Sequence, residues 1–175
     1  RIPFSVCLGP DERRAFEAAI LEDPGAVFDA FSKISVKDAK AGKQSDEDMI
    51  RATVEEQVGF SRLNAIAFEQ MRNWIFGECR TIAAEAEGVE NLWKKNQIAS
   101  LMRRFQLLPE AKELYHEVIA GRTEHYGPRH VETLQSKMNL ATLLAEEKTP
   151  ESTAEAMELY REVIAGRTEH YGPRH

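Results

Sequence analysis

One segment of the chain occurs twice. The fourteen residues EVIAGRTEHYGPRH stand at Glu117–His130 and again, letter for letter, at Glu162–His175. The similarity extends further toward the N-terminus, because Glu110–His130 and Glu155–His175 differ at only two positions. The two copies are 45 residues apart. Self-similarity with a period of about 20–50 residues is typical of proteins built from stacked structural repeats.

Both copies carry the apolar pattern of an amphipathic helix, with apolar residues at i, i+3, i+4, i+7 and i+8. These residues are Ala111, Leu114, Tyr115, Val118 and Ile119 in the first copy and Ala156, Leu159, Tyr160, Val163 and Ile164 in the second. Gly127 and Pro128 then predict a turn, because proline lacks an amide donor and glycine tolerates unusual dihedrals. A second helical pattern covers Thr133–Glu147. The sequence therefore predicts a repeated helix–turn–helix unit, an all-α solenoid.

Two stretches also match each other in a second set of apolar and small residues, once three extra residues in KTPES are allowed. The matching residues are Ile98, Ala99, Met102, Ala111 and Tyr115 in the first stretch and Leu140, Ala141, Leu144, Ala156 and Tyr160 in the second. This pattern resembles the tetratricopeptide repeat (TPR), in which small residues let the two helices of a repeat approach closely. The stretch GRTEHYGPRHVETLQSKMNLATLL is similar to the long-repeat subclass typified by kinesin light chain. The 45-residue period departs from that subclass.

The resemblance covers residues 92–175 and implies an α-α superhelix, with residues 92–130 as the first repeat and 131–175 as the second. It implies a non-catalytic scaffold or adaptor that presents a concave surface to a partner peptide or subunit. By analogy, the concave residues are Trp93, Asn96, Gln97, Ser100, Arg103 and Arg104 in the first repeat and Gln135, Met138, Asn139, Thr142 and Glu146 in the second. For any one of them, the alternative is plain solvated helix surface.

Two neighbouring arginines suggest the chemistry of the partner. Arg103 and Arg104 carry planar guanidinium groups, which bind carboxylates through two parallel hydrogen bonds. The resemblance places them on the concave surface, so we expect an acidic or C-terminal carboxylate segment there. The alternative is that they pair with Glu110 and Glu113 of the following helix.

Residues 1–90 also show helical periodicity and are expected to form an N-terminal helical cap on the first repeat. The expected helices are ERRAFEAAILED with Phe16, Ala19 and Ile20 inward, Ala26–Ile34 with Val27, Phe28, Phe31 and Ile34 inward, a helix capped by Ser45 with Ile50, Val54 and Val58 on one side, and Phe60–Glu85. Pro24-Gly25 is expected to stop the first of these helices and Gly59 to separate the last two. Trp74 and Trp93 are expected to pack in the core or cap, with groove lining as the alternative for Trp93.

The sequence contains no motif of a nucleotide-binding loop, a zinc protease, a serine hydrolase or an EF-hand. We therefore expect no enzymatic activity, cofactor or metal. His125 and His130, with their copies His170 and His175, have poor ligand spacing and are expected to order the turn between repeats. Cys7 and Cys79 are expected to be reduced thiols, because the chain has no other cysteine and no CxxC spacing.

Charge and hydropathy exclude further classes of partner. Residues 1–92 carry 11 Lys and Arg against 17 Asp and Glu, whereas residues 93–175 carry 12 of each. Neither half is basic enough to indicate nucleic acid, and no apolar run approaches the ~18–20 residues that cross a bilayer. We expect an intracellular protein, in the cytoplasm or, after removal of a transit peptide, in an organelle. The N-terminus lacks Met, so we expect it to be a processed or incomplete end.

Two further expectations concern the organisation of the repeats. The native chain is expected to continue past the second copy, because that copy stops where the next helix should begin. Tyr160, Val163 and Ile164 are therefore expected to lack a covering helix. Ala141 and Ala156 are expected to meet at a close helix crossing.

Two alternative functions stay open: a permanent structural subunit of a larger assembly, or targeting repeats attached to a regulatory or catalytic module in residues 1–90.

Overall fold

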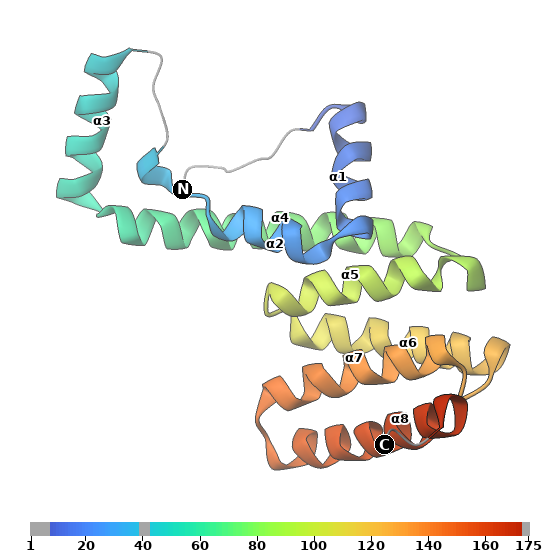
Figure 1. Cartoon of the computed structure of the whole chain (residues 1–175). Coiled ribbons are helices and arrows are strands. Elements are labelled where there is room, and N and C mark those ends of the chain that lie inside the picture. The colour runs from blue at the N-terminus through green and yellow to red at the C-terminus, as the bar shows by residue number, and fades with distance from the viewer. Residues whose placement is uncertain (1–7, 39–42, 173–175) are drawn as a thin grey trace.

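The computed structural model describes residues 8–38 and 43–172, and over these ranges it consists of eight α-helices and two short 3-10 turns without a strand (Figure 1). The helices are α1 (Pro10–Glu22), α2 (Pro24–Ser32), α3 (Gln44–Gln57), α4 (Phe60–Glu85), α5 (Leu92–Arg104), α6 (Leu108–Tyr126), α7 (Val131–Glu147) and α8 (Pro150–Tyr171), and the turns are η1 (Val36–Asp38) and η2 (Val89–Asn91). The prediction of an all-α chain is confirmed.

The helices of the duplicated region form two antiparallel pairs that stack on each other. Figure 1 shows α5 paired with α6 and α7 paired with α8, and α6 and α7 are in contact. Each pair buries small residues where its helices pack, Ala99 and Ala111 in the first and Ala141 and Ala156 in the second. The predicted α-α superhelix is confirmed.

The 45-residue period contains a 42-residue repeat with an insertion of three residues. A hydrogen bond joins the hydroxyls of Ser100 and Tyr115 at 2.9 Å, and its counterpart joins Tyr160 to Thr142 at 3.4 Å. Thr142 follows Ser100 by 42 positions, whereas Tyr160 follows Tyr115 by 45. Helix α8 has 22 residues and α6 has 19, so the insertion becomes one extra turn at the start of α8.

The HYGPRH turn is built from its own side chains and backbone. Gly127 ends α6 with φ +94°, a conformation that favours glycine. Its carbonyl accepts a hydrogen bond from Thr133 Oγ1 at 2.9 Å, and His130 Nδ1 accepts one from the backbone N–H of Glu132 at 3.3 Å, which caps α7. The ring of Tyr126 stacks on His130 with centroids 4.7 Å apart. The turn is therefore rigidly defined by local contacts.

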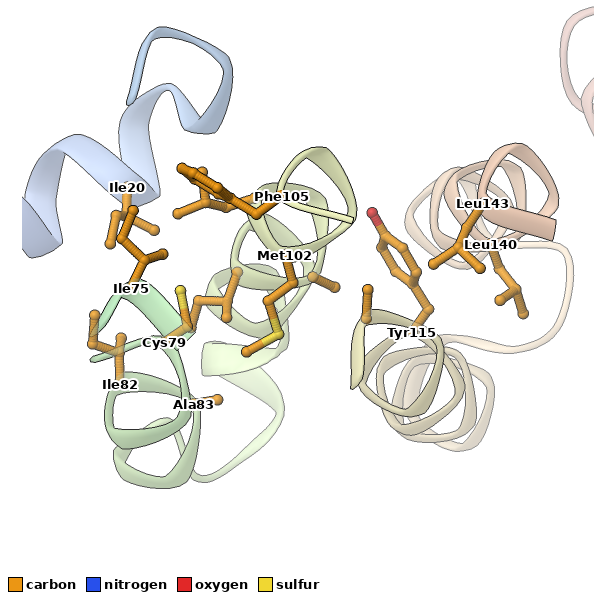
Figure 2. Packing of buried hydrophobic residues seen from close by; sticks show 14 of the residues in the cluster. Ile20, Ile75, Cys79, Ile82, Ala83, Met102, Phe105, Tyr115, Leu140 and Leu143 are labelled. Carbon is orange, nitrogen blue, oxygen red and sulfur yellow. The ribbon is translucent and has the colours of Figure 1, made fainter. Parts of the chain in front are cut away.

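The N-terminal helices share one core with the repeats. Helices α1, α2 and α4 contact α5. Helices α2 and α4 run antiparallel to each other, as α5 and α6 do (Figure 1). Figure 2 shows the buried cluster continuing from Ile20 and Ile75 through Met102 and Phe105 to Tyr115. Aromatic rings strengthen this junction, since Phe28 meets Phe105 at 5.0 Å and Phe16 meets Trp74 at 5.0 Å. The expected packing role of Trp74 is confirmed.

Three details of the N-terminal prediction are wrong. Helix α3 begins at Gln44 after Lys43, so Ser45 lies inside the helix and is not its N-cap. Helix α1 ends at Glu22, before Pro24, as expected, but α2 begins at Pro24 and not at Ala26, because Asp23 caps it by accepting a hydrogen bond from the Ala26 N–H at 2.9 Å. Ala19 and Ile34 are exposed, because Ala19 lies off the buried face of α1 and Ile34 follows the end of α2. The break at Gly59 and the helix Phe60–Glu85 are confirmed.

Helix α3 stands away from the stacked helices (Figure 1). None of its residues is buried, and Met49, Ile50 and Val58 are exposed large apolar residues. The apolar side that the sequence predicts for this helix therefore exists, but no other part of the described chain covers it.

Candidate partner-binding face

The eleven residues that the family resemblance assigns to partner binding lie on α5 and α7, and we call this surface the A-helix face. Two contacts join the helices across it. Asn139 Nδ2 donates to Asn96 Oδ1 at 3.2 Å, and Arg103 forms an ion pair with Glu146. Because each contact links equivalent regions of successive repeats, the two sets of residues lie next to each other.

In the first repeat, four of the six residues are engaged in internal contacts, and Arg103 is one of them through its ion pair with Glu146. Asn96 is only 8% exposed. Gln97 Nε2 donates to the carbonyl of Leu21 at 3.0 Å, which attaches α5 to the end of α1. Ser100 is bonded to the Tyr115 hydroxyl. These polar groups hold helices together and present little free hydrogen-bonding capacity.

The remaining residues of the first repeat are more accessible. Trp93 is 45% exposed at the start of α5, and Arg104 is exposed at its end. The guanidinium of Arg104 lies so close to α2 that a Cβ added at Gly25 would be 3.1 Å from its Nη2. Trp93 and Arg104 thus mark the two ends of α5 on which a partner could find exposed side chains.

The second repeat presents a chain of side-chain hydrogen bonds along α7. Arg167 Nη2 donates to Gln135 Oε1 at 3.0 Å, and Gln135 Nε2 donates to Asn139 Oδ1 at 3.2 Å. Thr142 donates to the carbonyl of Met138 at 2.9 Å. Gln135 and Glu146 are exposed and the other three predicted residues are half-buried.

The electrostatics of the face centre on Arg103. Its guanidinium pairs with Glu146 of α7, not with Glu110 or Glu113, so the alternative pairing for this arginine is wrong. Burial raises the pKa of the nearby Tyr115 hydroxyl, an effect opposed by its hydrogen bonds to Ser100 and Arg103. The hydroxyl therefore stays protonated near neutral pH and remains a donor.

Sequence reasoning missed Arg122. Its side chain is buried between repeats, where Nη1 donates to the Glu132 carbonyl at 2.9 Å and to Ser136 Oγ at 2.8 Å, and Nη2 pairs with the Glu132 carboxylate at 2.8 Å. Burial lowers the pKa of this guanidinium against the opposing effect of the Glu132 charge. A signal was present, because Arg122 continues the apolar stripe of α6 four positions after Val118.

The histidines and cysteines are possible metal ligands by their chemistry. Within the described ranges, no group of three or more His, Cys, Asp or Glu is placed to hold a metal ion. His125 packs edge-on against Tyr126, with ring centroids 4.5 Å apart. Cys79 is a buried free thiol, and burial together with the charge of Glu78 raises its pKa to about 12, which suppresses the reactive thiolate. Cys7 and His175 lie outside the described residues.

The helix pairs, their small buried residues and their spacing agree with a comparison of the sequence with known families. Residues 92–132 and 151–175 match the model of the tetratricopeptide repeat. This part of the chain consists of tetratricopeptide repeats. No curated protein and no solved structure matches it. TPR units generally mediate protein–protein interaction and are typically non-catalytic. Over the described residues, no helix is both long and apolar enough to span a bilayer.

Proposed function

We propose that this TPR protein is a non-catalytic scaffold whose A-helix face binds a segment of a partner protein. The observation that supports this most directly is the pair of contacts Asn96–Asn139 and Arg103–Glu146, which align α5 and α7 into one polar surface. Exposed Trp93 gives this surface an aromatic anchor of the kind found at interaction hot spots.

The charges of the face favour an acidic partner segment. Arg104 is exposed and has no ion pair among the described residues. Arg103 already pairs with the Glu146 carboxylate, and this proposal has a partner carboxylate take the place of Glu146. A partner acid that displaces Glu146 would meet a guanidinium that is already held on this face, because the Arg103 side chain is only 21% exposed. We also propose that the repeats are of the long-repeat subclass typified by kinesin light chain.

Residues 1–90 act in this proposal as a cap that completes the first repeat. Helices α1, α2 and α4 cover α5 with an apolar core that includes Ile20 and Ile75. Without these helices α5 would expose Met102 and Phe105, so the cap would prevent the N-terminal end of the repeats from associating with other chains. The division between cap and repeats is placed at residues 90 and 91.

A permanent role inside a larger assembly is the second candidate, and α3 is the observation that favours it. A helix with exposed Met49, Ile50 and Val58 and no buried residue is a candidate for a lasting interface. Affinity purification of the chain separates the two roles. A fixed stoichiometric set of partners supports the assembly, whereas exchangeable partners displaced by an acidic peptide support the scaffold.

The double variant Arg103→Glu with Arg104→Glu tests the scaffold. Binding of the captured partner should fall at least about tenfold, because two attractive charges become repulsive ones, and should lose much of its salt dependence. A matched control is Arg14→Glu with Arg161→Glu, which makes the same charge change at exposed positions on α1 and α8. Unchanged affinity in the first variant, with native helicity by circular dichroism, would refute the proposed face.

A further inference from the structure

A groove with a volume of about 490 Å³ lies between α4, α5 and α6. It is distinct from the A-helix face, because α5 directs Lys95 and Met102 into it and Asn96 and Arg103 toward α7. A step of one residue turns a helix by ~100°, so these two pairs of residues occupy different sides of α5. We propose that this groove binds an amphipathic helix of a partner protein that carries basic residues beside its apolar face.

The groove can bury an apolar face. Phe76 of α4 and Leu114 of α6 line it and are half-buried, whereas Ala83 and Met102 close its floor and are already buried. Helices α4 and α6 are held apart by α5 (Figure 1), so the space between them has a helix on each side and one beneath. Laying an apolar helix face into a groove of this kind is a common mode of peptide recognition.

The wall formed by α6 is acidic and incompletely neutralised. Glu110, Glu113 and Glu117 follow each other along one side of α6 and all line the groove. Glu117 pairs with Lys95, but neither Glu110 nor Glu113 has an ion pair within the described residues. Residues at i and i+3 on a helix are neighbours, so these two carboxylates match two basic residues one turn apart on a bound helix.

The duplicated segment shows what such a glutamate binds. Glu155 of α8 is the counterpart of Glu110, 45 positions later, and its carboxylate pairs at 3.5 Å with Lys112 of α6, the second helix of the first repeat. For Glu110 of α6 the corresponding helix is α4, and the α4 cation that lines the groove, Arg80, lies over the Phe76 ring at 5.6 Å instead of pairing with Glu110. The place that Lys112 takes in one copy is left for a partner's cation in the other.

The test uses a fluorescent synthetic helix of 18 residues with leucines on one face and lysines flanking them, together with a scrambled peptide of the same composition. Fluorescence anisotropy measures their affinities for the full chain. The amphipathic helix should bind at least about tenfold more tightly than the scrambled one, because both charge and apolar burial contribute. Equal affinity of the two peptides, or no binding of the amphipathic helix, would overturn the proposal.

Variants then locate the binding site. Glu110→Gln with Glu113→Gln should weaken binding of the amphipathic helix by about five- to tenfold, whereas the counterpart change Glu155→Gln with Glu158→Gln should leave it within about twofold. Ala84→Trp, at an exposed position lining the groove, should abolish binding by filling the space while the helicity stays native. Equal losses in both glutamine variants would indicate general attraction by the protein's charge and would sink the idea.

The outcome is independent of the scaffold proposal. The variant Arg103→Glu with Arg104→Glu changes the A-helix face and should leave affinity for the lysine-flanked helix within about twofold, because the altered side chains point away from the groove. A loss in this variant as large as that caused by Glu110→Gln with Glu113→Gln would place the binding site elsewhere.

Discussion

Helices α6 and α8 end in the same ten residues, EVIAGRTEHY, yet the two copies have different surroundings. Contacts made within a repeat are the same in both. Lys95 pairs with Glu117 as Lys137 pairs with Glu162. Added Cβ atoms at Gly121 and Gly166 would lie 2.9 Å from Leu92 and 2.8 Å from Leu134, so both helix pairs cross closely at a glycine.

Contacts made between repeats differ. Arg122 is buried against α7, whereas its counterpart Arg167 is half-buried and bonds back to Gln135. Ile119 packs against the core, whereas its counterpart Ile164 is 64% exposed. The identical sequence therefore gives the same contacts within each helix pair, whereas the contribution of the outer face to stability depends on the helix packed against it. Substituting the two residues of an equivalent pair, one in each copy, measures that contribution.

The largest difference is expected at the arginine pair. Arg122→Ala should lower the free energy of unfolding by about 2–3 kcal/mol, because it removes three polar contacts and leaves the buried Ser136 with fewer partners. Arg167→Ala should change it by less than about 0.5 kcal/mol. Urea denaturation followed by circular dichroism measures both. Equal effects would show that the contacts of Arg122 with α7 do not distinguish the two copies.

Overpacking within a repeat should instead act equally in both copies. Ala99→Leu and Ala141→Leu each place three extra heavy atoms at a fully buried position, which typically costs about 1–3 kcal/mol. Ala145→Leu, at an exposed position of α7, is the control and should change stability by less than about 0.5 kcal/mol. If Ala141→Leu leaves the thermal midpoint unchanged, the assignment of repeat positions is wrong.

The isoleucine pair should show a smaller contrast between repeats. Ile119→Ala should cost about 1–2 kcal/mol, because its side chain packs against the core, and Ile164→Ala close to nothing. Thermal unfolding of the two variants measures the difference. The expectation that Tyr160, Val163 and Ile164 all lack cover is correct only in part, since Val163 is fully buried against its own repeat and Tyr160 half-buried.

Extending the chain with a second Val131–Glu147 segment sharpens this contrast. The added helix should cover Ile164 and engage Arg167 as α7 engages Arg122. Ile164→Ala should then become as costly as Ile119→Ala, and light scattering should show less self-association. A destabilisation by Ile164→Ala that is the same with and without the extension would contradict this role for the neighbouring helix.

The smallest effect is expected at the lysine pair. Lys95→Ala and Lys137→Ala each break an ion pair whose glutamate is about half exposed, and such pairs contribute about 0–1 kcal/mol. The two losses should agree with each other and shrink together as salt is added. A loss in one copy alone would mean that the contacts within the two repeats are not equivalent.

Much of the fold could be predicted from local patterns. The helix Phe60–Glu85, the break at Gly59 and the three-residue insertion follow from apolar periodicity and turn residues, and the structure has them at those positions. Predictions failed where a helix end depends on its surroundings. Asp23 caps α2 although it closely follows α1, and Ala19 is exposed because the packing direction of α1 is set by α5.

The candidate binding surfaces could be predicted only as sets of residues. The resemblance named Asn96, Gln97 and Arg103, but the sequence does not show that Asn96 meets Asn139, that Gln97 reaches Leu21, or that Arg103 pairs with Glu146. Those pairings join residues dozens of positions apart. Side-chain hydrogen bonds of this kind depend on how successive helices are placed, which periodicity does not encode.

The sequence by itself determined the secondary structure and the repeat family, because helical periodicity, small residues at helix crossings and the Gly-Pro turn act over a few residues. Tertiary structure alone decided the roles of identical residues. Glu110 and Glu155 are the first residues of two segments that differ at only two of 21 positions, but Glu155 meets Lys112 while Glu110 lines an open groove beside α4. The physical reason is that burial and ion pairing depend on the neighbouring helix, and the two copies have different neighbours.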